Sequence, residues 1–189
     1  SPVLALTNKS ASETVNETTA NVEQNFNEYA TNDESSPSED GATATLRIME
    51  TTDLHSNIVP YDYYKDTDEG VAYGLAKTAT LIQQARSEVK NSMLFDAGDM
   101  IQGNPLASYV KNHLEDDETH PLFAAMNALQ YDAAIIGNHE FNYGLDYLDK
   151  VLEGANFPTL NANVYKLDEE GNIVGNYFTP YEILDKKII

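Results

Sequence analysis

The chain has 189 residues, of which 41% are hydrophobic and none is cysteine, so a sizeable core can form but disulfides and zinc–thiolate sites cannot. Its 31 acidic and 11 basic residues give a formal net charge of −20. This charge disfavours binding to nucleic-acid polymers and anionic membranes, and it disfavours phosphate chemistry unless bound cations reverse the local potential. The sequence contains no apolar run long enough for a membrane span.

Residues 1–44 are rich in Asn, Ser, Thr and acidic residues and poor in large apolar side chains. Such a segment buries too little apolar surface to offset the entropy lost on ordering, so we expect a disordered, solvated tail. Near its start, Val3-Leu4-Ala5 is similar to the small-residue cleavage site of a signal peptide. This similarity predicts an exported bacterial protein, either secreted or associated with the cell wall.

From residue 45 onward, short apolar strands are expected to alternate with amphipathic helices. Leu46 and Ile48 alternate with polar residues, as in a strand, whereas apolar residues recur at helical spacing between Leu75 and Val89. In chain order, the sequence predicts strand 46–51, helix 75–89, strand 93–95, helices 105–111 and 121–129, strand 133–136, helix 145–153, a strand beginning at 158, and a strand or hairpin arm within 178–189. Strands separated by helices predict an α/β fold with a parallel sheet.

Each of the first three predicted strands is followed by a polar cluster. These clusters are Asp53-Leu54-His55, Gly98-Asp99 and Gly137-Asn138-His139-Glu140. Because the carboxyl ends of parallel strands lie at one edge of the sheet, we expect the three clusters to converge. Their oxygen and nitrogen donors suit two divalent cations of the Mn, Zn, Fe or Co kind. Asp99, on the middle strand, is best placed to bridge the two ions.

The same residues also have structural interpretations. An aspartate after a strand often caps a helix, and Asn138 could adopt a left-handed backbone after Gly137. For Glu140, we favour a carboxylate that satisfies backbone amides at a helix N-terminus. His113 and His120 lie in an acidic connecting segment and are expected at the surface. The joint occurrence of ligand-type residues after three consecutive strands favours the metal interpretation.

The stretches TTDLHSN, DAGDMIQGNP and GNHEFNYG resemble the first three motifs of the calcineurin-like metallophosphoesterases, in particular their exported nucleotidase branch. The resemblance implies an αββα sandwich around two metal ions. It also implies that Asp53, His55 and Asp99 hold the first metal and that Asp99 and Asn138 hold the second. By the same resemblance, His139 would lie over the phosphate as a catalytic acid or electrostatic stabiliser.

The third motif also indicates a branch of the family. In 5′-nucleotidases an aspartate, as in GNHEFD, usually pairs with the catalytic histidine, whereas this sequence has Asn142. The form GNHEFNYGLDYL resembles the bifunctional 2′,3′-cyclic-nucleotide 2′-phosphodiesterase/3′-nucleotidases. This resemblance implies small nucleotides as substrates, with cyclic phosphates opened and the 3′-phosphate then removed. A 5′-nucleotidase or a nucleotide pyrophosphatase is the alternative.

The family takes further histidine ligands from later motifs, including one of the GHxH type, which this sequence lacks. We therefore expect residues 45–189 to be the N-terminal part of a truncated catalytic domain, with a half-built site and little activity by itself. The alternative of a different class is a non-catalytic surface interaction module that keeps the fold. Asn104, close after Asp99, is a further candidate contact for the substrate.

Overall fold

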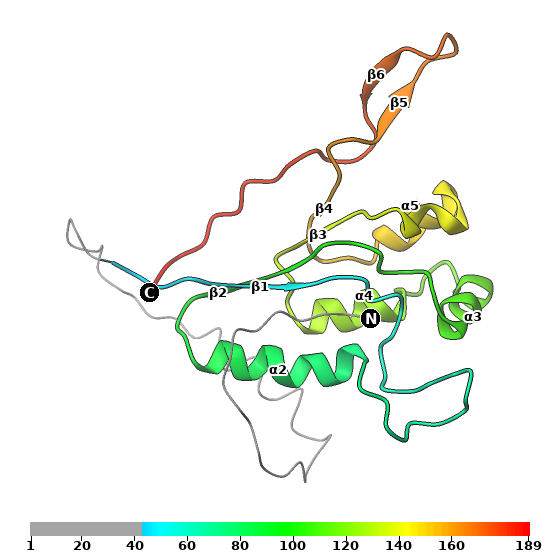
Figure 1. The fold of residues 1–189 in the computed structure, drawn as a ribbon. Helices are drawn as coiled ribbons and strands as arrows, with labels where there is room; N and C mark the ends of the chain where they lie inside the picture. Colours follow the sequence, from blue (N-terminus) through cyan, green and yellow to red (C-terminus); the bar gives the residue numbers. More distant parts are fainter. Residues whose placement is uncertain (1–42) are drawn as a thin grey trace.

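The computed structural model describes residues 43–189 (Figure 1), and nearly all of the predicted tail, with Val3-Leu4-Ala5, lies outside this range. The elements are β1 (Arg47–Thr51), α2 (Leu75–Ser87), β2 (Ser92–Asp96), α3 (Pro105–His113), α4 (Pro121–Ala128), β3 (Ala133–Ile135), the 3₁₀ helix η2 (His139–Tyr143), α5 (Leu145–Leu152), β4 (Thr159–Leu160), β5 (Tyr165–Leu167) and β6 (Ile173–Asn176). Among the helices described, none has the length and apolar character required to cross a bilayer.

The first four strands form one parallel sheet in the order β1-β2-β3-β4. Thr51, the last residue of β1, pairs with Asp96, the last residue of β2. Asp96 in turn pairs with Ala134 of β3. The carboxyl ends of these three strands therefore lie side by side, as the sequence predicts. Crossovers between parallel strands are right-handed as a rule, which in this strand order places the connecting helices on one face of the sheet. In Figure 1, α2 and α4 lie together on one side of the sheet.

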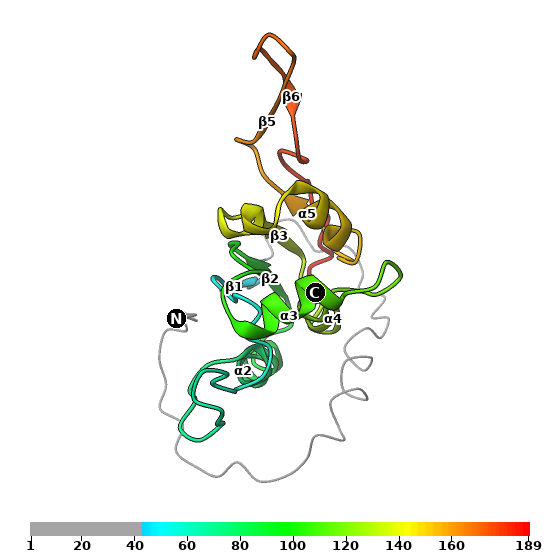
Figure 2. The same ribbon diagram turned by 90° about the vertical axis from the view of Figure 1, so that its right-hand side faces the viewer.

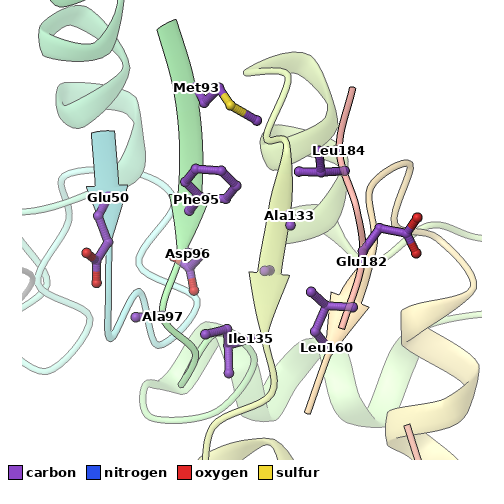
Figure 3. A pocket seen from close by; sticks show the side chains of 11 residues that line it. Glu50, Met93, Phe95, Asp96, Ala97, Ala133, Ile135, Leu160, Glu182 and Leu184 are labelled. Carbon is purple, nitrogen blue, oxygen red and sulfur yellow. The ribbon is translucent and has the colours of Figure 1, made fainter. Parts of the chain in front are cut away.

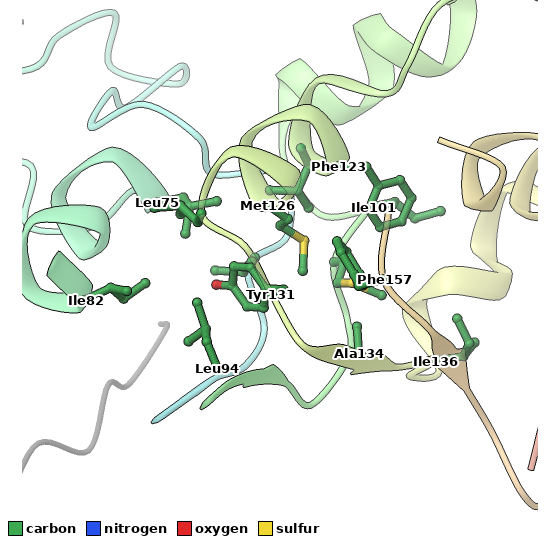
Figure 4. Close-up of a cluster of buried hydrophobic side chains, with 14 of the residues drawn as sticks. Leu75, Ile82, Leu94, Ile101, Phe123, Met126, Tyr131, Ala134, Ile136 and Phe157 are labelled. Atoms are coloured by element: carbon green, nitrogen blue, oxygen red, sulfur yellow. The ribbon is translucent and has the colours of Figure 1, made fainter. Parts of the chain in front are cut away.

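One hydrophobic cluster joins this helical layer to the sheet (Figure 4). Its members include Leu75 and Ile82 of α2, Phe123 and Met126 of α4, Leu94 and Ala134 of the strands, and Phe157. Leu94 and Phe123 are completely buried. Full burial of a large apolar side chain stabilises a fold by about 1.5 to 3 kcal/mol. The cluster therefore holds the strands rigidly, and the loops that leave their carboxyl ends start from fixed positions.

The opposite face of the sheet carries no helix from the described residues. Ile48 and Ile135 point to this side and are 57% and 51% exposed. A pocket of about 450 Å³ lies over the same face, between Phe95 and the chain segment that carries Glu182 and Leu184 (Figure 3). The four-stranded sheet and its helical layer thus provide one half of the implied αββα arrangement.

The bounds of the predicted elements up to β4 differ from those in the structure by no more than two residues. The prediction for residues 178–189 is wrong, because this segment forms only an isolated bridge from Thr179 to Leu160. The antiparallel β5–β6 hairpin was not predicted, and it projects away from the sheet (Figure 2). Its strands have only three and four residues and are largely exposed, so the sequence pattern is too short to identify them.

Candidate metal centre

The loops after β1 and β2 remain hydrogen-bonded to each other beyond the ends of the strands. The backbone N–H of Asp53 donates to the carbonyl of Gly98 at 3.0 Å, and that of His55 donates to the carbonyl of Asp99 at 2.9 Å. These bonds continue the parallel pairing into the polar clusters. The two clusters are therefore brought together by backbone contacts and do not depend on flexible side chains.

Asp53, His55 and Asp99 each offer one ligand atom, and these three atoms lie within 4.8 Å of one another. All three residues are partly buried and have positive φ angles, of 53°, 47° and 60°. A left-handed backbone costs a residue other than glycine about 1 to 3 kcal/mol, and it persists where the surrounding structure imposes it. The positive φ angles therefore indicate that the surrounding structure holds these three residues in place. The carboxylates of Asp53 and Asp99 lie on the same rim of the sheet.

The donor set fits a divalent cation. His55 Nδ1 lies 2.5 Å from the carbonyl oxygen of Gln102, so the ring donates there and its Nε2 is left on the side of Asp53, 3.5 Å from Oδ1. The Thr52 hydroxyl donates to Asp53 Oδ2 at 2.5 Å and lowers the pKa of that carboxyl. The site therefore presents an ionised carboxylate and an oriented imidazole nitrogen, as a cation of the Mn or Zn kind requires.

The third loop brings His139 to the same place. Its backbone N–H donates to Asp99 Oδ1 at 2.8 Å. Its ring stands edge-on to that of His55, with centroids 5.1 Å apart and an interplanar angle of 79°. Asn138 is exposed at the start of η2 with φ of −76°, so the left-handed interpretation of this residue is wrong.

Glu140 is completely buried and connects two of the loops. Its carboxylate accepts N–H groups from Gly137 at 2.6 Å, Asp99 at 2.9 Å and Ile101 at 3.2 Å, and also from Met100. The expectation that Glu140 satisfies backbone amides agrees with these contacts. However, three of the four amides belong to the loop after β2, so the carboxylate fixes the backbone that carries Asp99.

The approach of these two loops leaves no room for a side chain at Gly98 or Gly137. A Cβ atom on Gly98, where φ is +97°, would lie 2.7 Å from the nitrogen of Gly137. A Cβ atom on Gly137 would lie 2.6 Å from the nitrogen of Asp99. Both glycines therefore permit close backbone approach beside the candidate bridging ligand.

Asp96 opens the second of the three motifs, but no role was predicted for it from the sequence. It is buried, accepts the Thr51 hydroxyl at 2.6 Å and accepts the Gly98 N–H at 2.9 Å. Burial raises the pKa of this carboxyl to about 7. Asp96 therefore supports the turn before Asp99 from inside the sheet. An aspartate at the end of an apolar strand is the signal that could have revealed it.

Asn104 caps α3, since its side-chain oxygen accepts the Ala107 N–H at 2.8 Å and its amide donates to Asn57 at 3.1 Å. A contact of Asn104 with substrate remains a prediction. Of the two histidines expected at the surface, His113 is exposed. His120 is 1% exposed, so the prediction for it is wrong. Its ring packs near Phe123, and its Nδ1 accepts the Leu122 N–H at the start of α4, the first turn of which is buried in the core.

Asn142 and Gln102 complete the surroundings of His139. Asn142 Nδ2 lies 3.0 Å from His139 Nδ1, so Asn142 is close to the ring where the resemblance places an aspartate in 5′-nucleotidases. Gln102 Oε1 lies 2.9 Å from the same nitrogen. Sequence reasoning missed Gln102, because a glutamine in a polar loop carries no signal of such a contact.

Comparison with known proteins agrees with this geometry. The model of the calcineurin-like phosphoesterase family matches residues 46–187. The chain is 52% identical over 149 residues to the 2′,3′-cyclic-nucleotide 2′-phosphodiesterase/3′-nucleotidase of Salmonella typhimurium, covering 78% of this chain. It is 36% identical over 143 residues to the snake venom 5′-nucleotidase of Naja atra, covering 74% of this chain and 26% of the relative.

Among solved structures, the calcineurin-like phosphoesterase YfkN of Bacillus subtilis matches with a TM-score of 0.70 and 50% identity, covering 76% of this chain and 43% of that one. The chain spans 22% of the length of the Salmonella relative. The comparisons therefore concern one part of longer proteins, and this part includes all three polar loops.

Proposed function

Because the chain belongs to the calcineurin-like phosphoesterase family, we propose that it forms part of a metal-dependent hydrolase of nucleotide phosphoesters, which opens 2′,3′-cyclic nucleotides and then removes the 3′-phosphate. The observation that carries this proposal is the convergence of Asp53, His55 and Asp99, with ligand atoms within 4.8 Å of one another beside the ring of His139. The chain supplies the residues of three loops, and the complete site also draws on residues outside it.

The residues divide between metal binding and catalysis. Asp53, His55 and Asp99 would hold one divalent cation, and Asp99 with Asn138 would hold a second. When bound, the two cations would polarise the phosphoryl oxygens and lower the pKa of water for attack. In a chain with a net charge of −20, they would also offset the repulsion between the carboxylates and an anionic substrate.

His139 is proposed to give a proton to the leaving ribose oxygen. Its backbone N–H is held by Asp99 Oδ1 at 2.8 Å, which fixes the base of the side chain beside the candidate bridging ligand. Its Nδ1 is engaged by Gln102, so Nε2 is the nitrogen available to the substrate. General acid catalysis of this kind contributes about 10²- to 10⁴-fold to a rate.

Two observations favour the cyclic nucleotide over a 5′-nucleotide. The Salmonella relative, named for the cyclic-nucleotide activity, is more similar to this chain than the snake venom 5′-nucleotidase. In addition, the residue beside His139 Nδ1 is the uncharged Asn142. A 5′-nucleotidase is the second candidate, supported by the snake venom relative. Export from the cell is part of the proposal, supported by the similarity of Val3-Leu4-Ala5 to a cleavage site.

The test uses the full-length gene product with Mn²⁺ and compares 2′,3′-cyclic AMP, 3′-AMP and 5′-AMP as substrates. We expect hydrolysis of the first two, loss of activity after chelation, and restoration by added Mn²⁺. Activity on 5′-AMP alone would move the assignment to the second candidate. Activity that survives complete removal of metal would reject the mechanism, and a metal-loaded protein inactive on all three would support the interaction module.

A further inference from the structure

Gln102 contacts both histidines of the candidate site through different atoms. Its main-chain carbonyl lies 2.5 Å from Nδ1 of His55, and its side-chain Oε1 lies 2.9 Å from Nδ1 of His139. The two rings are 5.1 Å apart. A change of the Gln102 side chain therefore removes the contact with His139 and leaves the atom that orients His55 in place.

The chemistry of the amide fixes the orientation of the His139 ring. A carbonyl oxygen can only accept, so the hydrogen lies on Nδ1 and the opposite nitrogen, Nε2, faces away from Gln102. Asn142 Nδ2 donates to the same oxygen at 3.1 Å, and a carbonyl oxygen has two lone pairs for two donors. The 3.0 Å separation of Asn142 Nδ2 and His139 Nδ1 follows, because both donors share one acceptor.

The backbone around Gln102 is held against the site. The next residue, Gly103, has φ of +142°, and a Cβ atom there would lie 2.7 Å from Nδ1 of His55. On the other side, the N–H of Ile101 donates to the buried carboxylate of Glu140 at 3.2 Å. The residues before and after Gln102 are thus both held against the site, so the Cα position from which the Gln102 side chain extends is fixed.

From this geometry, and resting on the proposed function, we propose that Gln102 is the positioning residue of His139, holding Nδ1 so that Nε2 faces the leaving oxygen of the nucleotide. As the bond between phosphorus and the ribose 3′-oxygen breaks, the electron pair goes to that oxygen, which takes the proton from Nε2. The hydrogen on Nδ1 stays bonded to that nitrogen and remains donated to Gln102 Oε1. Water forms the new bond to phosphorus and releases a proton to solvent.

The first experiment replaces the amide with an apolar side chain of similar length, Gln102→Met, in the full-length protein. We expect kcat on 3′-AMP to fall about 10- to 100-fold with little change in KM, the loss typical of a misplaced catalytic group. Because the main-chain carbonyl remains, the Kd for Mn²⁺ measured by calorimetry should stay within about threefold. Gln102→Glu, which keeps an acceptor at the same place, should restore most of the rate. Gln84→Met, on the exposed side of α2, is the matched control.

A second measurement separates positioning from general damage to the site. p-Nitrophenyl phosphate has a leaving group that departs without a proton, so Gln102→Met should slow its hydrolysis less than about threefold. In a His139→Ala background, Gln102→Met should cause no further loss on 3′-AMP. Equal losses on both substrates, or an additional loss without His139, would overturn the proposal.

A third readout does not depend on turnover. Nitrogen-15 spectra of the histidine rings in the metal-free protein should show hydrogen on Nδ1 of His139, and this preference should disappear in Gln102→Met. A bare Nδ1 in the wild-type protein would overturn the proposal. Inactivity of the wild-type enzyme on every phosphoester would instead reject the proposed function, so the two failures are distinguishable.

Discussion

The carboxylate of Glu140 accepts the backbone N–H of Asp99 at 2.9 Å, so the candidate bridging ligand is held from behind by a buried charge. Neighbouring amides of Met100 and Ile101 donate to the same carboxylate. An ionised carboxylate that accepts several N–H groups forms stronger bonds than a neutral acceptor. The position of Asp99 is therefore set by Glu140 before any ligand binds.

We expect Glu140→Gln to destabilise the protein by about 2 to 4 kcal/mol, because an amide offers one acceptor atom where the carboxylate offers two and leaves buried N–H groups unpaired. The Kd for Mn²⁺ should rise about tenfold or more, since Asp99 loses its support. Chemical denaturation and calorimetry measure the two effects. The exposed Glu153→Gln should change stability by no more than about 0.5 kcal/mol. Unchanged Mn²⁺ affinity in Glu140→Gln would contradict this role.

Replacing Asp99 should reduce metal binding and activity more than replacing Asn138. If Asp99 bridges two ions, Asp99→Ala should lose both at Mn²⁺ concentrations that saturate the wild type, whereas Asn138→Ala should keep one. Activity on 3′-AMP should fall further in Asp99→Ala. Metal analysis after gel filtration gives the stoichiometry, with the exposed Asn112→Ala as the control. Equal, modest losses in both variants would argue against bridging.

Gly137→Ala should damage the site by a steric effect. A Cβ atom there would meet the backbone of Asp99 at 2.6 Å, and we expect a loss of about 1 to 3 kcal/mol in stability with weaker Mn²⁺ binding. Gly171→Ala is the control, since Gly171 has φ of +86° but no atom within 4 Å of an added Cβ. The control should cost about 1 kcal/mol of backbone strain and leave metal affinity unchanged. Thermal unfolding and calorimetry decide the comparison, and wild-type affinity in Gly137→Ala would refute the steric account.

His120 should make the fold less stable in acid. Burial lowers the pKa of His120 to about 4, below the ordinary value of 6.5. Above pH 6.5 the ring is neutral in both states, so its full contribution to stability is present. As the pH falls, the unfolded chain takes up the proton first, and stability is lost between about pH 6.5 and 4. The expected loss from this residue is about 2 kcal/mol between pH 7 and 5.

Denaturant unfolding at several pH values measures this effect. His120→Asn keeps an oxygen that can accept the Leu122 N–H at the helix cap and removes the titration, so the fall in stability from pH 7 to 5 should be smaller in this variant. His113→Asn, at an exposed position, should retain the wild-type dependence. The same pH dependence in both variants would show that His120 is not responsible.

The sequence determined much of the sheet layer. Apolar alternation and helical spacing predicted β1 and α2, and Pro105 and Pro121 are the first residues of α3 and α4, where a missing N–H costs nothing. The convergence of the polar loops followed from parallel topology alone. These features depend on local patterns and on one general rule of parallel sheets, so they could be predicted without coordinates.

Other features were decided only by the tertiary structure. One such feature is the burial of His120. Others are three of the four amides bound by Glu140 and the two contacts of Gln102, which connect residues far apart in the sequence. The segment 178–189 has a strand-like sequence but only one bridge to the sheet. The sequence by itself thus determined which residue types meet at the rim. Their orientation was decided by hydrogen bonds between loops, to peptide groups and to the side chains of Glu140 and Gln102. Such bonds depend on where the loops lie and carry no signature in the amino-acid sequence.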